Sequence, residues 1–254
     1  MKINHLYLIY FSPAGGTKKC VELMDGLFGL EAQYVDILSS AKELDIAGDA
    51  LAVFAVPVYG GRIPGPVYER MEHITGHGTP CLIMPVYGNR AVDDAGLEMG
   101  NLAKERHFIP VACASFIAPH SVSPAIASSR PDEKDTASAV KFRAELEKKL
   151  RSADKPCAVT IPGNEPYREF DGIPLKPSAS RKCTSCMKCA DECPAKAIPA
   201  DNPRKTDTGR CISCMHCVRI CPVSARRIPI VPKIMCGAAL KKICKTRREA
   251  EYIL

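Results

Sequence analysis

The chain of 254 residues has no long hydrophobic run. Its first apolar stretch, from Leu6 to Phe11, gives way after six residues to Ser12-Pro13. That is too short for the apolar region of a secretory signal peptide. No later run approaches the roughly 20 residues that a membrane-spanning helix needs. We therefore expect no membrane insertion and a location in the reducing cytoplasm.

Aromatic residues are also scarce, at 6% of the chain, although the formal net charge is +7. Residues 1–175 contain 18 Lys and Arg against 22 Asp and Glu, whereas residues 176–254 contain 17 against 6. A basic segment often indicates nucleic-acid binding, but no stacking aromatic side chains alternate with these basic residues as they do in single-strand binders. We therefore expect no nucleic-acid partner.

Cysteine is abundant by comparison, with 14 residues. Eight of them follow the spacing Cys-x2-Cys-x2-Cys-x3-Cys-Pro, which begins at Cys183 and again at Cys211. Ala197 in the first run corresponds to Ala225 in the second, so the stretch is an internal duplication. The other six cysteines have no ligand spacing and are expected in the core: Cys20, Cys81, Cys113, Cys157, Cys236 and Cys244.

Iron–sulfur chemistry accounts for this spacing. Three cysteines on one tight loop supply soft thiolates to three irons of a cubane, while the fourth, before proline, reaches the other cluster. Zinc sites use paired C-x2-C units instead, and disulfides would require secretion. The stretch resembles bacterial-type ferredoxins with two 4Fe–4S clusters. The two clusters together would carry a charge of about −4, which would offset part of the basic excess. One cluster takes Cys183, Cys186, Cys189 and Cys221, and the other takes Cys211, Cys214, Cys217 and Cys193.

Two common nucleotide motifs, the Walker loop and G-x-G-x-x-G, are absent. Instead, the first apolar run leads through a glycine-containing turn into a helical segment, a layout that directs backbone N–H groups at an anion. The hydroxyls at both ends suit a monophosphate, and the alternative is an ordinary strand-to-helix turn. The turn resembles the flavodoxin phosphate loop T/S-x-T-G-x-T, from which Ala14 departs, and it consists of Ser12, Pro13, Ala14, Gly15, Gly16 and Thr17.

Strands and helices alternate after this turn. We expect strands near 33–37, 51–56, 81–86 and 111–118, and helices near 66–73, 92–105 and 131–151. With the first strand, this predicts an α/β fold: a flavodoxin-like, doubly wound parallel five-stranded sheet of order 2-1-3-4-5, with a ligand beyond its carboxyl ends. The expected parts are a flavodoxin-like domain at 1–155, an ordered proline-rich connector at 156–176, a small α+β ferredoxin-like two-cluster domain at 177–232 and a basic helical tail at 233–254.

The ends of the third and fourth strands both carry a tyrosine followed by a glycine. A tyrosine ring offers a flat face for stacking, and glycine lets backbone amides approach a ring edge. Nearby arginines add positive charge, whereas the alternative is a pair of strand-end turns with surface tyrosines. The two segments are Pro57-Val58-Tyr59-Gly60-Gly61-Arg62 and Pro85-Val86-Tyr87-Gly88-Asn89-Arg90.

The phosphate-loop turn, the two Tyr-Gly segments and the C-terminal cysteines occur in the chain together with three further segments. These are the run Asn89 to Gly96, His120-Ser121 and Arg130-Pro131-Asp132. In this the sequence resembles the flavodoxin–ferredoxin fusion family of anaerobes over nearly its whole length. The resemblance implies FMN in the first domain, two 4Fe–4S clusters in the second and electron transfer between them. It implies FMN contacts from Ser12, Pro13, Ala14, Gly15, Gly16, Thr17, Pro57, Val58, Tyr59, Gly60, Gly61, Tyr87, Gly88, Asn89, Arg90 and Asp93.

Two functions remain open from the sequence. The first is a redox enzyme that reduces a small-molecule acceptor at the flavin, and the alternative is an electron carrier between redox proteins. A sizeable cleft over the flavin would favour the enzyme, and a flavin edge sealed by Tyr59 and Tyr87 would favour the carrier. His120 is the candidate proton donor, and the alternative is a loop histidine in a hydrogen-bonded turn. The sequence also leaves a homodimer open.

Overall fold

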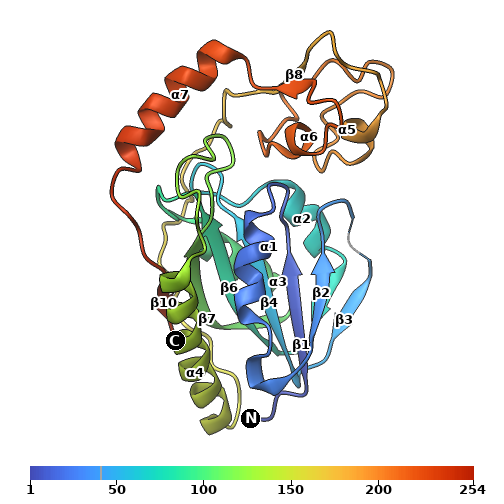
Figure 1. The fold of residues 1–254 in the computed structure, drawn as a ribbon. Coiled ribbons are helices and arrows are strands. Elements are labelled where there is room, and N and C mark those ends of the chain that lie inside the picture. The colour runs from blue at the N-terminus through green and yellow to red at the C-terminus, as the bar shows by residue number, and fades with distance from the viewer. Residues whose placement is uncertain (41) are drawn as a thin grey trace.

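The computed structural model describes residues 1–40 and 42–254. The first part of the chain forms an α/β structure, and a smaller cysteine-rich part lies beyond the carboxyl ends of its strands (Figure 1). None of the helices within these described residues is long and apolar enough to cross a membrane.

Five parallel strands form the centre of the sheet. Their order is β2 (Ala32–Asp36), β1 (His5–Tyr10), β4 (Ala50–Pro57), β6 (Thr79–Tyr87) and β7 (Phe108–Ile117), which confirms the predicted order 2-1-3-4-5. Strands β4 and β6 are buried along their entire length. A parallel strand covered by helices on both faces needs apolar side chains on both, so continuous apolar runs become the central strands.

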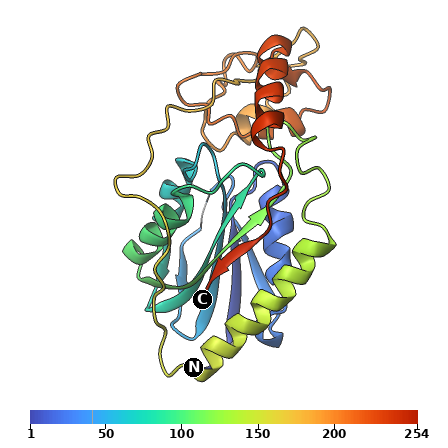
Figure 2. The ribbon, with the colours of Figure 1, turned by 90° about the vertical axis from the view of Figure 1, so that its left-hand side faces the viewer.

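Helices cover both faces of this sheet (Figure 2). Helices α1 (Gly16–Val21) and α4 (Glu133–Ser152) pack on one face, and α2 (Pro66–Met71) and α3 (Ala95–Glu105) pack on the other. The stripe predicted for α4 is buried, with its members Ala139, Phe142, Leu146 and Leu150. The sequence analysis missed the short elements η1 (Glu22–Met24), η2 (Leu27–Gly29), and the paired strands β3 (Leu44–Ile46) and β5 (Ile74–Gly76).

Residues 153–177 connect α4 to the small part without a helix or strand (Figure 2). The segment is nevertheless held against the start of α3. The backbone amides of Asn164 and Arg168 donate to the buried carboxylate of Asp94 at 2.8 and 2.7 Å. The connector is therefore fixed by hydrogen bonds, as expected for a proline-rich linker without Gly/Ser runs.

The C-terminal tail corrects two expectations. Helix α7 (Ile230–Ile243) is followed by a return to the sheet, where β10 (Glu251–Ile253) pairs antiparallel with β7. The sheet therefore has six strands instead of five, and the tail predicted as helical over 233–254 is helical only as far as Ile243. Three-residue strands carry too little pattern to be recognised in a sequence, and this one is specified by its tertiary partner.

Four of the six remaining cysteines, Cys20, Cys81, Cys113 and Cys244, are buried as expected. Cys157 is exposed in the connector, and Cys236 is only half-buried, on α7. The expectation that all six are core residues is therefore wrong for these two. Both lie in segments that run over the surface of the sheet domain, where an apolar residue can remain in contact with solvent.

Candidate functional site

The cysteine-rich part is built from two copies of one loop-and-helix unit. The copies contain α5 (Lys188–Asp191) and α6 (His216–Arg219), and the strands β8 (Ser178–Ala179) and β9 (Arg226–Arg227) pair antiparallel. Six non-glycine residues have left-handed backbone at three matched positions, and each costs about 1–2 kcal/mol relative to an ordinary conformation. They are Ser185 (φ 57°) with Ser213 (54°), Met187 (65°) with Met215 (64°), and Lys196 (48°) with Ser224 (50°).

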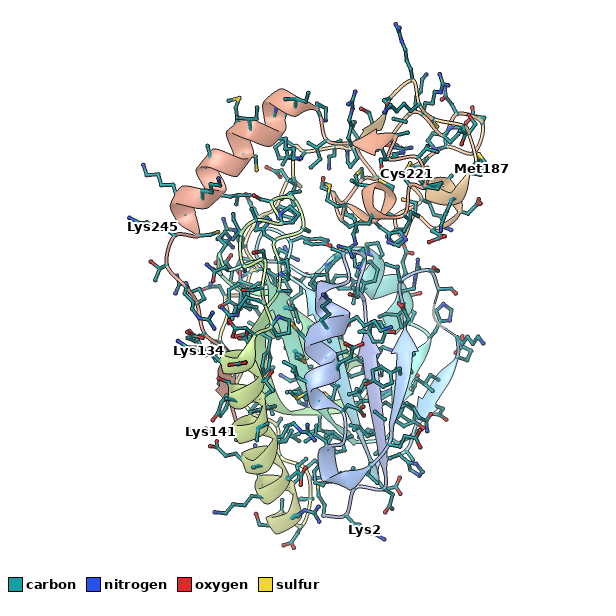
Figure 3. All side chains as sticks on the ribbon, in the orientation of Figure 1. Lys2, Lys134, Lys141, Met187, Cys221 and Lys245 are labelled. Carbon is teal, nitrogen blue, oxygen red and sulfur yellow. The ribbon has the colours of Figure 1, made fainter. Side chains whose placement is uncertain are left out.

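Each copy bends around a small cavity lined by four cysteines. The first cavity is lined by Cys183, Cys186, Cys189 and Cys221, and the second by Cys211, Cys214, Cys217 and Cys193. Met187 and Cys221 come from different copies, line the first cavity and both appear in the small part in Figure 3. The structure thus brings together the two crossed sets that the spacing predicted, with the fourth cysteine of each run in the other copy.

Electrostatics shows why the second set needs a cation. Burial, together with smaller contributions from the neighbouring Cys217, Cys193 and Cys211, raises the pKa of the Cys214 thiol to about 12. Burial likewise raises the pKa of Cys217 to about 12. Thiols that oppose one another's ionisation become thiolates together only beside positive charge, which iron supplies. The donor set therefore fits a cluster.

The fourth cysteine of each run receives a matching backbone donor. The amide of Ala197 lies 3.3 Å from Cys193 Sγ, and that of Ala225 lies 3.2 Å from Cys221 Sγ. Among the described residues, no three His, Cys, Asp or Glu side chains could hold a single metal ion. The cysteines surround a space instead of meeting at a point, as ligands of a cubane do and ligands of one zinc ion do not.

A cavity of about 200 Å³ lies between the carboxyl ends of the strands, the connector and helix α7. The loops that follow β1, β4 and β6 bring twelve of the predicted FMN contacts to it: Pro13, Ala14, Gly16, Thr17, Pro57, Val58, Tyr59, Gly60, Gly61, Tyr87, Gly88 and Arg90. His120 and Ser121 line it as well. Val86, Ala91 and Val122, from segments already singled out, also line it, and the sequence analysis missed Ala118, Pro119, Ile173, Cys236 and Leu240.

The missed residues come from segments whose position depends on tertiary structure. Ile173 belongs to the connector, and Cys236 and Leu240 belong to α7. All three lie far from the strand ends in sequence, and no motif marks them. They pack with Val122 into a small apolar cluster, which also contains Met215 from the second cysteine run.

Tyr59 lies between this cavity and the second cysteine set. The side chain is only 6% exposed, so the alternative of a surface tyrosine does not hold. Its hydroxyl is buried and has no partner among the described residues. Burial raises the pKa of Tyr59 well above its ordinary value, and the nearby Cys214 raises it further. Tyr59 therefore lines the cavity and also lies near Cys214 of the second cysteine set.

His120 packs directly on Gly88, because a Cβ there would lie 2.7 Å from the imidazole ring. Its Nδ1 is buried and has no partner within residues 1–40 and 42–254. Burial lowers the pKa of His120, and the positive charge of Arg90 lowers it further. The imidazole is therefore neutral near pH 7 and presents a free nitrogen beside the cavity.

Four residues expected at the cofactor have other contacts. Ser12 Oγ accepts from the Lys18 amide at 2.8 Å, and Asp93 pairs with both Arg90 and Arg168.

The Asn89 side chain holds the C-terminal tail. Its amide nitrogen donates to the carbonyls of Cys244 and Thr246 at 3.0 and 2.9 Å, and its oxygen accepts from the Arg248 backbone amide at 2.9 Å. Gly15 lines a smaller neighbouring cavity. Arg62, expected to add positive charge, is neutralised by Glu98 at 2.7 Å.

The cysteine-rich part contacts the loop after β1 directly. His216 Nδ1 lies 3.0 Å from the carbonyl oxygen of Pro13. On the same short helix, Arg219 reaches over Gly15, with its guanidinium nitrogen 3.1 Å from the place of a Cβ on that glycine. The second cysteine set, which includes Cys217 on this helix, is therefore the one nearer to the loop after β1.

Comparisons with known proteins find likenesses to both parts of the chain. Residues 182–226 match the family described as the 4Fe-4S dicluster domain. No curated protein matches the chain. Solved structures similar to the first part include a flavodoxin from Archaea (13% identity, TM-score 0.40, 58% of this chain and 99% of that chain) and one from Streptococcus pneumonia TIGR4 (15%, 0.40, 57% and 99%). A third is rubredoxin oxygen:oxidoreductase from Desulfovibrio gigas (10%, 0.42, 59% and 37%).

The strand order and the dicluster match define the class of this protein. A flavodoxin-like α/β domain is followed by a 4Fe–4S ferredoxin-type domain. This is the arrangement of a flavodoxin–ferredoxin fusion, and the resemblance noted in the sequence is confirmed at this level.

Proposed function

We propose that this chain is an iron–sulfur flavoprotein that passes electrons between two 4Fe–4S clusters and FMN. The observation that carries the proposal is the position of Tyr59. Tyr59 lines the strand-end cavity, and its hydroxyl lies close enough to Cys214 of the second cysteine set for that thiol to raise the pKa of the tyrosine, so one side chain lies beside both candidate centres. FMN supplies one- and two-electron chemistry when bound, and the clusters exchange single electrons.

The residues around the cavity fit FMN. Tyr59 and Tyr87 offer aromatic faces, while the Tyr59 hydroxyl and His120 Nδ1 are buried polar atoms that lack a partner in the described chain. The main cavity meets a smaller one of about 80 Å³ at Ala14, Gly16 and His120. One elongated ligand with a flat ring and an anionic tail suits the pair of cavities. The sequence has no second glycine-rich motif that could bind the adenylate part of FAD.

The burial of the two cavity tyrosines favours an electron carrier. Tyr59 and Tyr87 are 6% and 5% exposed, and Ile173, Cys236 and Leu240 cover the space from the other side. With both tyrosines buried, the edge of a flavin in this cavity would be covered by side chains of this chain.

One observation favours a reductase instead. A cavity of about 400 Å³ lies on the other side of Tyr87, between α3, the connector and β10. It is lined by Arg248, Glu251 and Asp93, so a polar acceptor could bind there with only Tyr87 and Ala91 between it and the flavin cavity. This second candidate function needs a substrate that binds in that space.

Anaerobic purification followed by flavin and iron analysis tests the main proposal. We expect FMN and about eight iron atoms per chain. FAD, or no flavin in an anaerobic preparation, would overturn it. A screen of small-molecule acceptors and redox proteins with the reduced protein then separates the two functions, because a carrier reduces only proteins.

A further inference from the structure

A small cavity of about 80 Å³ lies where the cysteine-rich part meets the loop after β1. The loop residues Ala14, Gly15 and Gly16 form one side, and Lys19 of α1 and Arg219 of α6 reach into it. The guanidinium of Arg219 comes from the opposite domain and lies over Gly15. The cavity is therefore completed by both domains.

Two cations line this cavity without a counter-charge. Within residues 1–40 and 42–254, neither Lys19 nor Arg219 has a carboxylate within the 4.0 Å of an ion pair. Other arginines at the sheet domain are neutralised, Arg62 by Glu98 and Arg130 by Asp135. Both side chains are exposed, so solvent screens their mutual repulsion, and an anion bound between them would gain two charge-assisted contacts.

We propose that Arg219 and Lys19 bind the phosphate of FMN, so that the cluster domain completes the flavin site. This inference rests on the proposed function. A phosphomonoester carries about −1.5 to −2 charges at pH 7, which two cations match, and a guanidinium presents its donors in a fork that suits phosphate oxygens. Gly15 has φ +80°, and any side chain there would meet the guanidinium.

Such a shared site couples flavin binding to domain docking. The cluster domain cannot move away from the loop without removing Arg219 from the phosphate. His216, three residues earlier, holds the same helix on Pro13. Bound FMN therefore keeps the second cysteine set beside the flavin, and riboflavin, which lacks the phosphate, does not.

Anaerobic titration of flavin-free, cluster-loaded protein with FMN and with riboflavin tests this. We expect Arg219→Ala to weaken FMN binding by roughly tenfold or more and to leave riboflavin binding unchanged. Arg219→Lys should be intermediate, because the charge remains and the fork is lost. Two control variants should bind both ligands as the unchanged protein does. Arg227→Ala removes the same charge elsewhere in the cluster domain, and Lys18→Ala removes the charge next to Lys19 in the sequence.

The outcomes separate the two proposals. If the unchanged protein binds no FMN, the proposed function fails. Suppose instead that the unchanged protein binds FMN. If Arg219→Ala then has unchanged affinity for both ligands, or equally weakened affinity for both, this inference alone is wrong. Limited proteolysis of the connector over 153–177 gives an independent readout, since FMN should protect it in the unchanged protein and not in Arg219→Ala. Equal protection by riboflavin would contradict the coupling.

Discussion

His216 Nδ1 lies 3.0 Å from the backbone carbonyl oxygen of Pro13. A carbonyl oxygen only accepts, so Nδ1 donates this hydrogen bond. The other ring nitrogen, Nε2, lies 3.3 Å from the Glu192 carboxylate. His216 directly precedes Cys217, and Pro13 belongs to the loop after β1, so this hydrogen bond joins a cysteine run to the edge of the sheet where the ligand cavity lies.

Removing this bond should weaken the docking of the two domains. We expect His216→Ala to keep both clusters and, when saturated with FMN, to show slower flavin reduction from a low-potential donor, because electron transfer depends on how the domains are held. His216→Asn should retain most of the rate, since its amide can still donate to Pro13. Stopped-flow absorbance of the flavin measures this, and equal rates for all three proteins would show that the contact does not hold the electron path.

Tyr59→Phe should change the clusters more than it changes FMN binding. The variant keeps the ring in the cavity and removes a buried hydroxyl that has no partner in the described protein. A hydroxyl that donates to the sulfur of a cluster raises its reduction potential, so we expect a lower potential for one cluster. Redox titration followed by electron paramagnetic resonance checks this, with Tyr68→Phe as a control on α2. An unchanged potential would mean that the hydroxyl does not reach the cluster.

The crossed sets predict opposite effects of two matched variants. Cys193→Ser should damage the cluster held by Cys211, Cys214 and Cys217, whereas Cys221→Ser should damage the cluster of the first run. Mössbauer or paramagnetic resonance spectra of each variant distinguish the clusters once the second is assigned by its response to Tyr59→Phe. Loss of the cluster local to each substituted cysteine would contradict the crossing.

Strong repeating patterns made much of this protein predictable. Continuous apolar runs became the central strands, and the spacing from Cys183 to Cys221 brought together the two sets of four. Contacts between segments distant in sequence were not predictable, because no local pattern encodes them. Three contacts illustrate this, because each joins two segments that only the fold brings together. They are the hydrogen bonds of Asn89 to the tail, the ion pair of Arg62 with Glu98 and the contact of Arg219 with Gly15.

Asn89→Ala should release the C-terminal tail. The side chain makes three hydrogen bonds to Cys244, Thr246 and Arg248, and its backbone is left-handed at φ 64°. With about 1 kcal/mol for each bond, we expect a loss of roughly 2–4 kcal/mol in unfolding free energy and faster cleavage of the tail by carboxypeptidase. Asn89→Gly also removes the three hydrogen bonds, but glycine adopts this φ without strain. The difference in unfolding free energy between Asn89→Ala and Asn89→Gly therefore measures the backbone strain. Equal tail cleavage in all three proteins would show that β10 alone holds the tail.

Finally, His120 should make stability depend on pH near neutrality. Burial and then Arg90 lower its pKa in the folded protein, so the unfolded chain binds the proton more readily. The stability that His120 contributes is therefore complete above the unfolded pKa of about 6.5 and is lost as pH falls through the lower folded value. We expect the melting temperature to fall between pH 7.5 and pH 5.5, and to fall less in His120→Gln, which cannot take up a proton. His5→Gln, at an exposed histidine, should retain the full dependence. A His120→Gln profile parallel to that of the unchanged protein would show that this buried imidazole does not titrate with unfolding.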